Sequence, residues 1–156
     1  MKLLVLSDSH GSSGSILTAL NKTSPDALIF LGDGLRDIRS VLEHRGDFPA
    51  FVVRGNCDLG AQEPAERLIE LQGTRLFICH GHTYGVKSGT SEARAAAERT
   101  GAQVLLYGHT HRPECRRVGD LWVLNPGSCD RSGTASAGIV SLESGGILCY
   151  NIRINE

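Results

Sequence analysis

The sequence has no excess of positive charge, no long hydrophobic run and no CxxC pair of cysteines. Lys and Arg total 16 against 17 Asp and Glu, and the formal net charge of −1 argues against dedicated nucleic-acid binding. The N-terminal apolar run covers only residues 3–6, too few for a signal peptide or a membrane span. Five scattered cysteines, an odd number, argue against a disulfide framework. These absences predict a cytoplasmic protein with no membrane partner.

Aromatic residues are also scarce, at 5% of the chain, whereas glycine is abundant. Nineteen glycines stand where average usage would give about 11, which indicates many tight loops of the kind that carry functional sites. The chain is 40% hydrophobic and 21% charged, so it can bury a real core and is not disordered. A length of 156 residues predicts one domain spanning residues 1–156.

Short apolar runs alternate with helical patterns along the first third of the chain. Runs at 3–6, 27–31 and 51–53 predict strands, and the periodicity at 13–20 and 37–44 predicts helices, with Ser12 or Ser13 as the first N-cap. Continuous apolar strands that alternate with helices predict an α/β fold with a sheet covered on both faces. In the remainder we expect strands at 67–71, 75–79, 104–107, 121–124, 137–142 and 147–152, and a helix at 91–100.

Polar loops follow the first three predicted strands. Ligands collect beyond the carboxyl ends of strands in such sheets, so Asp8, Asp33 and Asn56 should lie at one edge. Each residue also has a purely structural alternative. The two aspartates could cap the helices that follow, and Asn56 could serve the turn beside Gly55.

Five of the six histidines fall in three short motifs, each directly after an apolar run. The motifs are Asp8-x-His10, His80-x-His82 and His109-x-His111. One such pair is weak evidence for a metal site, but three pairs together with Asp33 and Asn56 favour one. Imidazole and carboxylate donors suit Mn, Fe, Ni, Co or Zn better than Ca or Mg alone.

The donors suffice for two metal ions. Asp8, His10 and His111 could hold one ion, Asn56, His80 and His109 the other, and Asp33 could bridge them. Two ions about 3.5–4 Å apart can clamp a phosphoryl group and turn a shared water into a hydroxide nucleophile. The residues therefore predict a phosphoesterase with a dinuclear centre.

The same blocks resemble those of the calcineurin-like metallophosphoesterases. In chain order they are Asp8-Ser9-His10, Gly32-Asp33, Gly55-Asn56-Cys57-Asp58, His80-Gly81-His82 and Gly108-His109-Thr110-His111. Asn125-Pro126-Gly127-Ser128 is similar to a loop of the small, YfcE-like phosphodiesterase branch. The resemblance implies a metallo-dependent phosphatase fold, a four-layer α/β/β/α sandwich of two mixed sheets.

The resemblance also implies the assignment of ligands. Asp8, His10, Asp33 and His111 would bind one divalent ion, and Asp33, Asn56, His80 and His109 the second. We expect Mn²⁺ first, with Ni²⁺, Fe, Zn²⁺, Co²⁺ or Mg²⁺ as alternatives.

Three residues are candidates for the chemistry itself: Asn56, Cys57 and His82. Many family members carry His where this chain has Cys57, and a thiol is a poorer general acid, which favours phosphodiesters with good leaving groups. Cys57 could instead be a small buried residue, and His82 could contact substrate or support a ligand. Arg36, Lys87, Arg112 and Arg131 are candidates for substrate contact only by their position in loops.

We therefore expect a metal-dependent phosphodiesterase that acts on a small molecule. A phosphomonoesterase of the same fold is the first alternative, and a catalytically silent scaffold is the second, although silent relatives lose metal-site histidines. The motif HxHxDH of metallo-β-lactamase-like hydrolases is absent from the sequence. A homo-oligomer that completes the substrate pocket is compatible with so short a chain.

Overall fold

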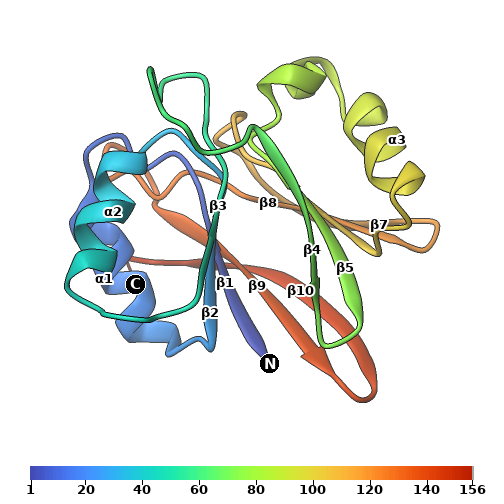
Figure 1. Cartoon of the computed structure of the whole chain (residues 1–156), viewed down its shortest axis with the longest axis horizontal. Helices are drawn as coiled ribbons and strands as arrows, with labels where there is room; N and C mark the ends of the chain where they lie inside the picture. The colour runs from blue at the N-terminus through green and yellow to red at the C-terminus, as the bar shows by residue number, and fades with distance from the viewer. Residues whose placement is uncertain (156) are drawn as a thin grey trace.

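The computed structural model describes residues 1–155, so the last residue of the predicted domain 1–156 lies outside the described part. Two five-stranded sheets pack face to face with helices on their outer sides (Figure 1). The elements are β1 (Lys2–Leu6), α1 (Ser13–Thr23), β2 (Ala27–Phe30), α2 (Leu35–Glu43), β3 (Ala50–Val52), β4 (Glu66–Leu71), β5 (Thr74–Cys79), η1 (His82–Tyr84), η2 (Val86–Ser88), α3 (Ser91–Arg99), β6 (Val104–Leu106), β7 (Pro113–Val118), β8 (Leu121–Pro126), β9 (Ser136–Glu143) and β10 (Gly146–Arg153).

Both sheets mix parallel and antiparallel pairs. The first has the order β10-β9-β1-β2-β3, in which β1, β2 and β3 run parallel. The second has the order β4-β5-β6-β8-β7, in which β5, β6 and β8 run parallel. The loops that follow each parallel set therefore gather at one edge of their sheet.

The side chains of β1 show why its apolar run is continuous. Leu3 and Val5 point between the two sheets and join a core that includes Ile78. Leu4 and Leu6 point outward and pack under α1 and α2. A third apolar cluster lies between the second sheet and α3. Three buried interfaces separate four layers, so the predicted α/β/β/α sandwich of two mixed sheets is confirmed.

Three details differ from the sequence-based expectation. The helix predicted at 37–44 begins at Leu35, because an acceptor from a distant loop satisfies its first amides, as described below. Strand β7 was not expected, since its pattern around Pro113 carries no apolar run and it is an edge strand. Helix α1 begins at Ser13, so Ser13 is not its N-cap, and the Ser12 hydroxyl donates to Asp130 rather than capping the helix. Within residues 1–155, none of the helices is long and apolar enough to cross a membrane.

Candidate metal centre

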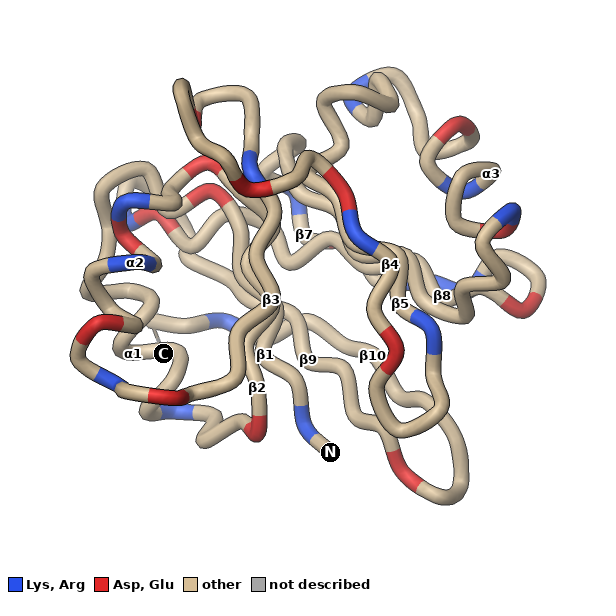
Figure 2. The backbone as a smooth tube through the Cα atoms, viewed as in Figure 1, with Lys and Arg blue, Asp and Glu red and all other residues tan. Residues whose placement is uncertain are grey.

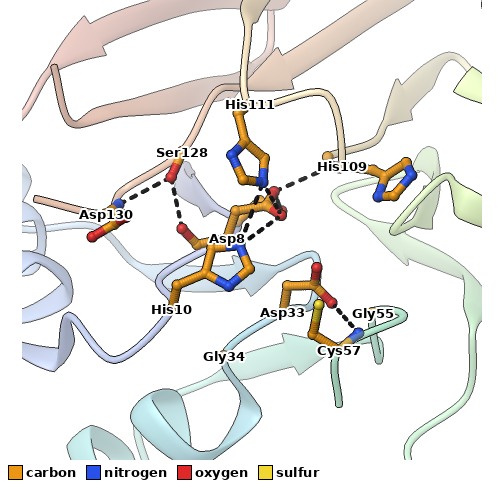
Figure 3. A network of polar contacts seen from close by, with 12 residues as sticks. Asp8, His10, Asp33, Gly34, Gly55, Cys57, His109, His111, Ser128 and Asp130 are labelled. Carbon is orange, nitrogen blue, oxygen red and sulfur yellow. Dashed lines mark hydrogen bonds and ion pairs between the residues drawn. The ribbon is translucent and has the colours of Figure 1, made fainter. Parts of the chain in front are cut away.

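The residues proposed as metal ligands come from five loops at the carboxyl ends of parallel strands. Asp8 and His10 follow β1, Asp33 follows β2, and Asn56 lies beyond β3. On the second sheet His80 follows β5, and His109 and His111 follow β6. Figure 3 shows the side chains of Asp8, His10, Asp33 and His111 converging from separate elements. The structure thus brings together residues that are as far as 103 positions apart, since Asp8 and His111 differ by 111 − 8.

Asp8 lies at the middle of the first group of donors. Its Oδ1 atom is 3.0 Å from Nε2 of His111 and 3.6 Å from Nε2 of His10. Oδ2 is occupied, because it accepts hydrogen bonds from the Ser7 hydroxyl at 2.5 Å and the His109 backbone amide at 3.1 Å. Oδ1 is buried and has no hydrogen-bond partner within the described residues. A buried carboxylate oxygen surrounded by imidazole nitrogens, with no proton donor of its own, fits a cation.

His80 organises the second group. Its Nε2 atom is 3.3 Å from Oδ2 of Asp33 and 3.1 Å from Oδ1 of Asn56. The other ring nitrogen, Nδ1, is 2.7 Å from the Leu31 carbonyl oxygen, to which its N–H donates. That bond keeps a proton on Nδ1, so Nε2 is the nitrogen that would offer its lone pair to a metal. Without a metal, burial lowers the pKa of His80, but the hydrogen bond to Asp33 and the charges of Asp8 and Asp33 outweigh this effect and raise it. Donor atoms of Asp33, His80 and His109 all lie within 4.8 Å of one another.

Asp33 is shared between the two groups. Its donor atoms also lie within 4.8 Å of those of His10 and Cys57, and its Oδ1 accepts the Cys57 backbone amide at 2.7 Å. Burial opposes ionisation of Asp33, but the hydrogen bond and charge of His80 and the Cys57 amide outweigh it and hold its pKa well below the ordinary range. An ionised carboxylate in contact with both groups can act as a bridge between two cations.

The candidate ligands concentrate backbone strain. In the described part of the chain, seven non-glycine residues have positive φ, and five of them are candidate ligands. Those five are Asp8, His10, Asp33, His109 and His111. Each such residue costs about 1–3 kcal/mol unless its surroundings impose the conformation. The left-handed turns aim side chains from short loops at a common point, and such strain is typical of functional sites.

Glycines beside the ligands permit close approach of neighbouring loops. A Cβ atom added to Gly55 would lie 2.0 Å from Oδ1 of Asp33, and one added to Gly108 would lie 2.1 Å from the Ser7 hydroxyl. Both distances are far below contact range. The glycine that precedes the ligand in each of these motifs is therefore required by packing.

Asp58 ties two of the ligand loops together. Its Oδ2 accepts the backbone amides of Asp33 and Gly55, each at 2.7 Å. Its Oδ1 accepts the amides of Gly34 and Leu35, each at 3.0 Å. Gly34 occupies the N-cap position of α2 and has no side chain to cap with, so Asp58 performs that role from β3's loop. The sequence alone left open whether Asp58 supports the site or serves a turn. Its position three residues after Gly55, in the same motif, was the feature of the sequence that could have indicated a supporting role.

Asn125 and Ser128 support the other ligand loops. Nδ2 of the buried Asn125 donates to the Gly108 carbonyl at 2.9 Å and to the Thr110 hydroxyl at 3.0 Å, which fixes the loop that carries His109 and His111. The Ser128 hydroxyl donates to the Asp8 carbonyl at 2.7 Å (Figure 3). No pattern of residue types in the sequence indicates these roles, and only the family resemblance pointed to this loop.

Cys57 and His82 differ in their exposure to solvent: Cys57 is exposed, whereas a ring nitrogen of His82 is buried. Cys57 is exposed, so the interpretation of this residue as a small buried side chain is wrong, because its loop projects beyond β3. Partial burial of its thiol and the charges of Asp33, Asp58 and Asp8 raise its pKa, which keeps the thiol protonated. The His82 ring lies 5.4 Å from the His80 ring, and its buried Nδ1 has no hydrogen-bond partner within residues 1–155. Burial first, and then the charge of His80, lower the pKa of His82 and favour the neutral ring.

The charges around the site favour a cation. Figure 2 shows several acidic segments close together in the loops beyond β1, β2 and β3, near the start of α2. Basic segments also lie there, at α2 and beyond β3, and elsewhere in that view basic and acidic segments are interspersed along the tube. A local concentration of carboxylates beside imidazole donors attracts divalent ions.

The sandwich of two sheets with imidazole and carboxylate donors at the carboxyl edge defines the class of metal-dependent phosphoesterases. Comparison with known proteins agrees: the family model described as "Calcineurin-like phosphoesterase superfamily domain" matches residues 1–145. The chain belongs to this superfamily, which supports a metal-dependent phosphoesterase.

Individual relatives support the same placement. The chain is 31% identical over 130 residues to the "Probable metallophosphoesterase YsnB" of Bacillus subtilis, covering 82% of this chain and 75% of that protein. It is 31% identical over 153 residues to the "Phosphodiesterase YfcE" of Escherichia coli K12, covering 82% and 79%. A solved structure of a predicted phosphoesterase from Streptococcus pneumoniae superimposes with a TM-score of 0.84 at 26% identity, over 99% of this chain and 90% of that one. The resemblance to the YfcE-like branch is thereby confirmed.

Proposed function

We propose that this protein is a phosphodiesterase that uses two divalent metal ions, with Mn²⁺ the preferred ion. The observation that carries the proposal is the pair of donor groups that share one edge of the sandwich and meet at Asp33. The phosphodiesterase activity in the printed name of the Escherichia coli relative supports the choice of reaction.

In this proposal each ion has its own ligands. Asp8, His10 and His111 would hold one, Asn56, His80 and His109 the other, and Asp33 would contact both. When bound, the ions would supply positive charge for the phosphoryl oxygens and lower the pKa of a water molecule.

The protein's own groups orient and support this centre. The Leu31 carbonyl holds His80 in one tautomer, and Asp58 fixes the backbone that presents Asp33. The Asn56 amide donates to the Cys57 sulfur at 3.5 Å, which places the thiol at the lip of the site. His82, whose ring lies 5.4 Å from the His80 ring, would contact the substrate phosphate.

Cys57 is the basis for preferring diesters with good leaving groups. A thiol whose pKa is raised keeps its proton and donates it poorly to a departing alkoxide. A leaving oxygen that needs little protonation should therefore depart fastest. A monoesterase would need the same phosphoryl site, so the substrate comparison below separates the two reactions. A silent scaffold is disfavoured because every donor position is filled.

The test compares metal-free and reconstituted protein. We expect Mn²⁺ or Ni²⁺ to restore hydrolysis of bis(4-nitrophenyl) phosphate, a rate well above that on 4-nitrophenyl phosphate, and two ions per chain by calorimetry. Asp33→Ala should abolish turnover and reduce the stoichiometry, whereas Asp47→Ala, on an exposed loop away from the site, should change neither. Full activity of Asp33→Ala, or a single ion per chain in the wild type, would refute the dinuclear proposal.

A further inference from the structure

An open cavity of about 530 Å³ lies beside the candidate metal centre on the side of the second sheet. The segment 86–90 forms one wall, and the start of β7 with the loop before it forms the other. Lys87, Arg112 and Arg116 contribute three cationic groups to the lining, against one carboxylate, Glu114. The size suits part of a small organic molecule rather than an isolated ion.

Two of the three cations are left without a carboxylate. Glu114 accepts hydrogen bonds from the Arg116 guanidinium and from the Tyr107 hydroxyl, so its charge is compensated internally. Arg116 is further held by the Thr90 hydroxyl at 3.0 Å. Neither Lys87 nor Arg112 forms a salt bridge with any carboxylate in the described chain. The cavity therefore carries a surplus of about two positive charges from two different loops.

The cavity and the metal centre share a wall. Thr110 lines the cavity and stands between His109 and His111, and its hydroxyl accepts hydrogen bonds from Asn125 and from the Arg112 backbone amide at 3.3 Å. A ligand in the cavity would therefore lie next to a phosphoryl group held by the metals.

A second open cavity, of about 390 Å³, borders the centre on the side of the first sheet. Its lining includes His10, Asp33 and Cys57. A diester has two alcohol substituents, and the two cavities offer each of them a separate place. The carboxylates that line this second cavity outnumber its cationic groups, whereas cationic groups predominate in the first cavity. The two cavities would therefore favour substituents of different charge.

We propose that the cavity lined by Lys87 and Arg112 binds a phosphate group carried by one substituent of the phosphodiester substrate. This inference rests on the proposed function and names the substrate class: diesters with a second, terminal phosphate. The Arg112 guanidinium can pair with two phosphate oxygens at once, and the Lys87 ammonium adds a mobile point charge. With a neutral or cationic substituent in the cavity, the charges of Lys87 and Arg112 would have no anionic partner on the substrate.

The test uses two chromogenic diesters of matched length, 4-nitrophenyl 3-phosphonopropyl phosphate and 4-nitrophenyl butyl phosphate. The phosphonate cannot itself be hydrolysed, so 4-nitrophenolate release reports the diester alone. We expect the wild type to favour the phosphonate substrate in kcat/KM by about tenfold or more, the effect of one charge-assisted hydrogen bond or better. Lys87→Gln/Arg112→Gln should remove that preference, mainly through KM. The control is Arg117→Gln, on β7 but stacked over Trp122, which should keep the preference.

A binding measurement separates this inference from the proposed function. Propylphosphonate titrated into metal-free wild-type protein, followed by NMR, should shift the Arg112 guanidinium signal, and the double variant should bind at least about tenfold more weakly. If neither diester is hydrolysed, the proposed function fails and this titration alone decides the inference. Equal preference in wild type and double variant, or phosphonate affinity unchanged by the two substitutions, would overturn it.

Discussion

Asp58 offers the sharpest test of how the centre is held together. Four backbone amides converge on its carboxylate: those of Asp33, Gly34, Leu35 and Gly55. Asp58→Ala leaves all four without this acceptor. It also removes the cap of α2, whose own N-cap position is a glycine. The same substitution frees the loop that carries Asp33 from the loop after β3.

The magnitude follows from these bonds. A hydrogen bond to a charged group contributes about 1.5–3 kcal/mol, and loss of an N-cap costs about 0.5–2 kcal/mol. Asp58 is half-buried, so water can reach part of the vacated site and the four terms do not add in full. We expect Asp58→Ala to lower the free energy of unfolding by about 3 kcal/mol, and turnover by about 10–100-fold, the range typical of residues that orient ligands. Asp58→Asn keeps one acceptor oxygen and should lie between Asp58→Ala and the wild type.

Urea unfolding of metal-free protein, monitored by circular dichroism, measures the first quantity, and hydrolysis of bis(4-nitrophenyl) phosphate measures the second. Asp47→Ala serves as the control, because Asp47 is an exposed acidic residue of a surface loop. A loss below about 1 kcal/mol for Asp58→Ala, with unchanged turnover, would show that the four bonds do not fix the loops.

Three further outcomes are expected. In the presence of a chelator, His111→Gly should leave the free energy of unfolding, measured by thermal melting, equal to that of the wild type or up to about 1 kcal/mol higher, because it relieves a positive φ of 59°. The control His44→Gly, at a helical φ of −93°, should lower the free energy of unfolding. Gly55→Ala should lower both soluble yield and metal binding, whereas Gly133→Ala, with open space around its Cα, should match wild type in melting and calorimetry. In metal-free protein Cys57 should react with iodoacetamide more slowly than a free thiol at pH 8, with a rate that climbs as pH rises through its elevated pKa; a rate equal to that of a small-molecule thiol would contradict this.

The sequence could predict the layers because burial on both faces leaves a simple pattern. Strand β1 needs apolar residues at every position, and its run of Leu and Val shows this directly. Edge strand β7 carries arginines and a proline, and pairs on one side only, so its pattern does not differ from that of a loop. The start of α2 was also misplaced, since its cap comes from a residue 23 positions later, Asp58 from Leu35. Local patterns cannot report contacts of that range.

The candidate ligands could be named from the sequence because their spacing after strands is local, and the topology then places the strand ends together. What spacing cannot show is how loops of two or three residues turn imidazoles toward one point. The answer is positive φ at Asp8, His10, Asp33, His109 and His111. Aspartate and histidine are enriched among non-glycine residues at positive φ, but only a small fraction of them adopt it, so residue type alone does not show which of them do.

Bringing these side chains together therefore lowers the stability of the metal-free protein. Five strained residues, at about 1–3 kcal/mol each, stand beside the buried Oδ1 of Asp8, which lacks a hydrogen-bond donor in the described chain. The bonds made by Asp58 and Asn125 and the packing at Gly55 hold the loops in place against this strain. A cation among these donors would satisfy the carboxylate and bind more tightly to the strained arrangement than to a relaxed one. The residues that reduce the stability of the metal-free fold are thus the same ones that would make its affinity for ions high. The surrounding loops, rather than the candidate ligands themselves, must therefore hold these side chains in place.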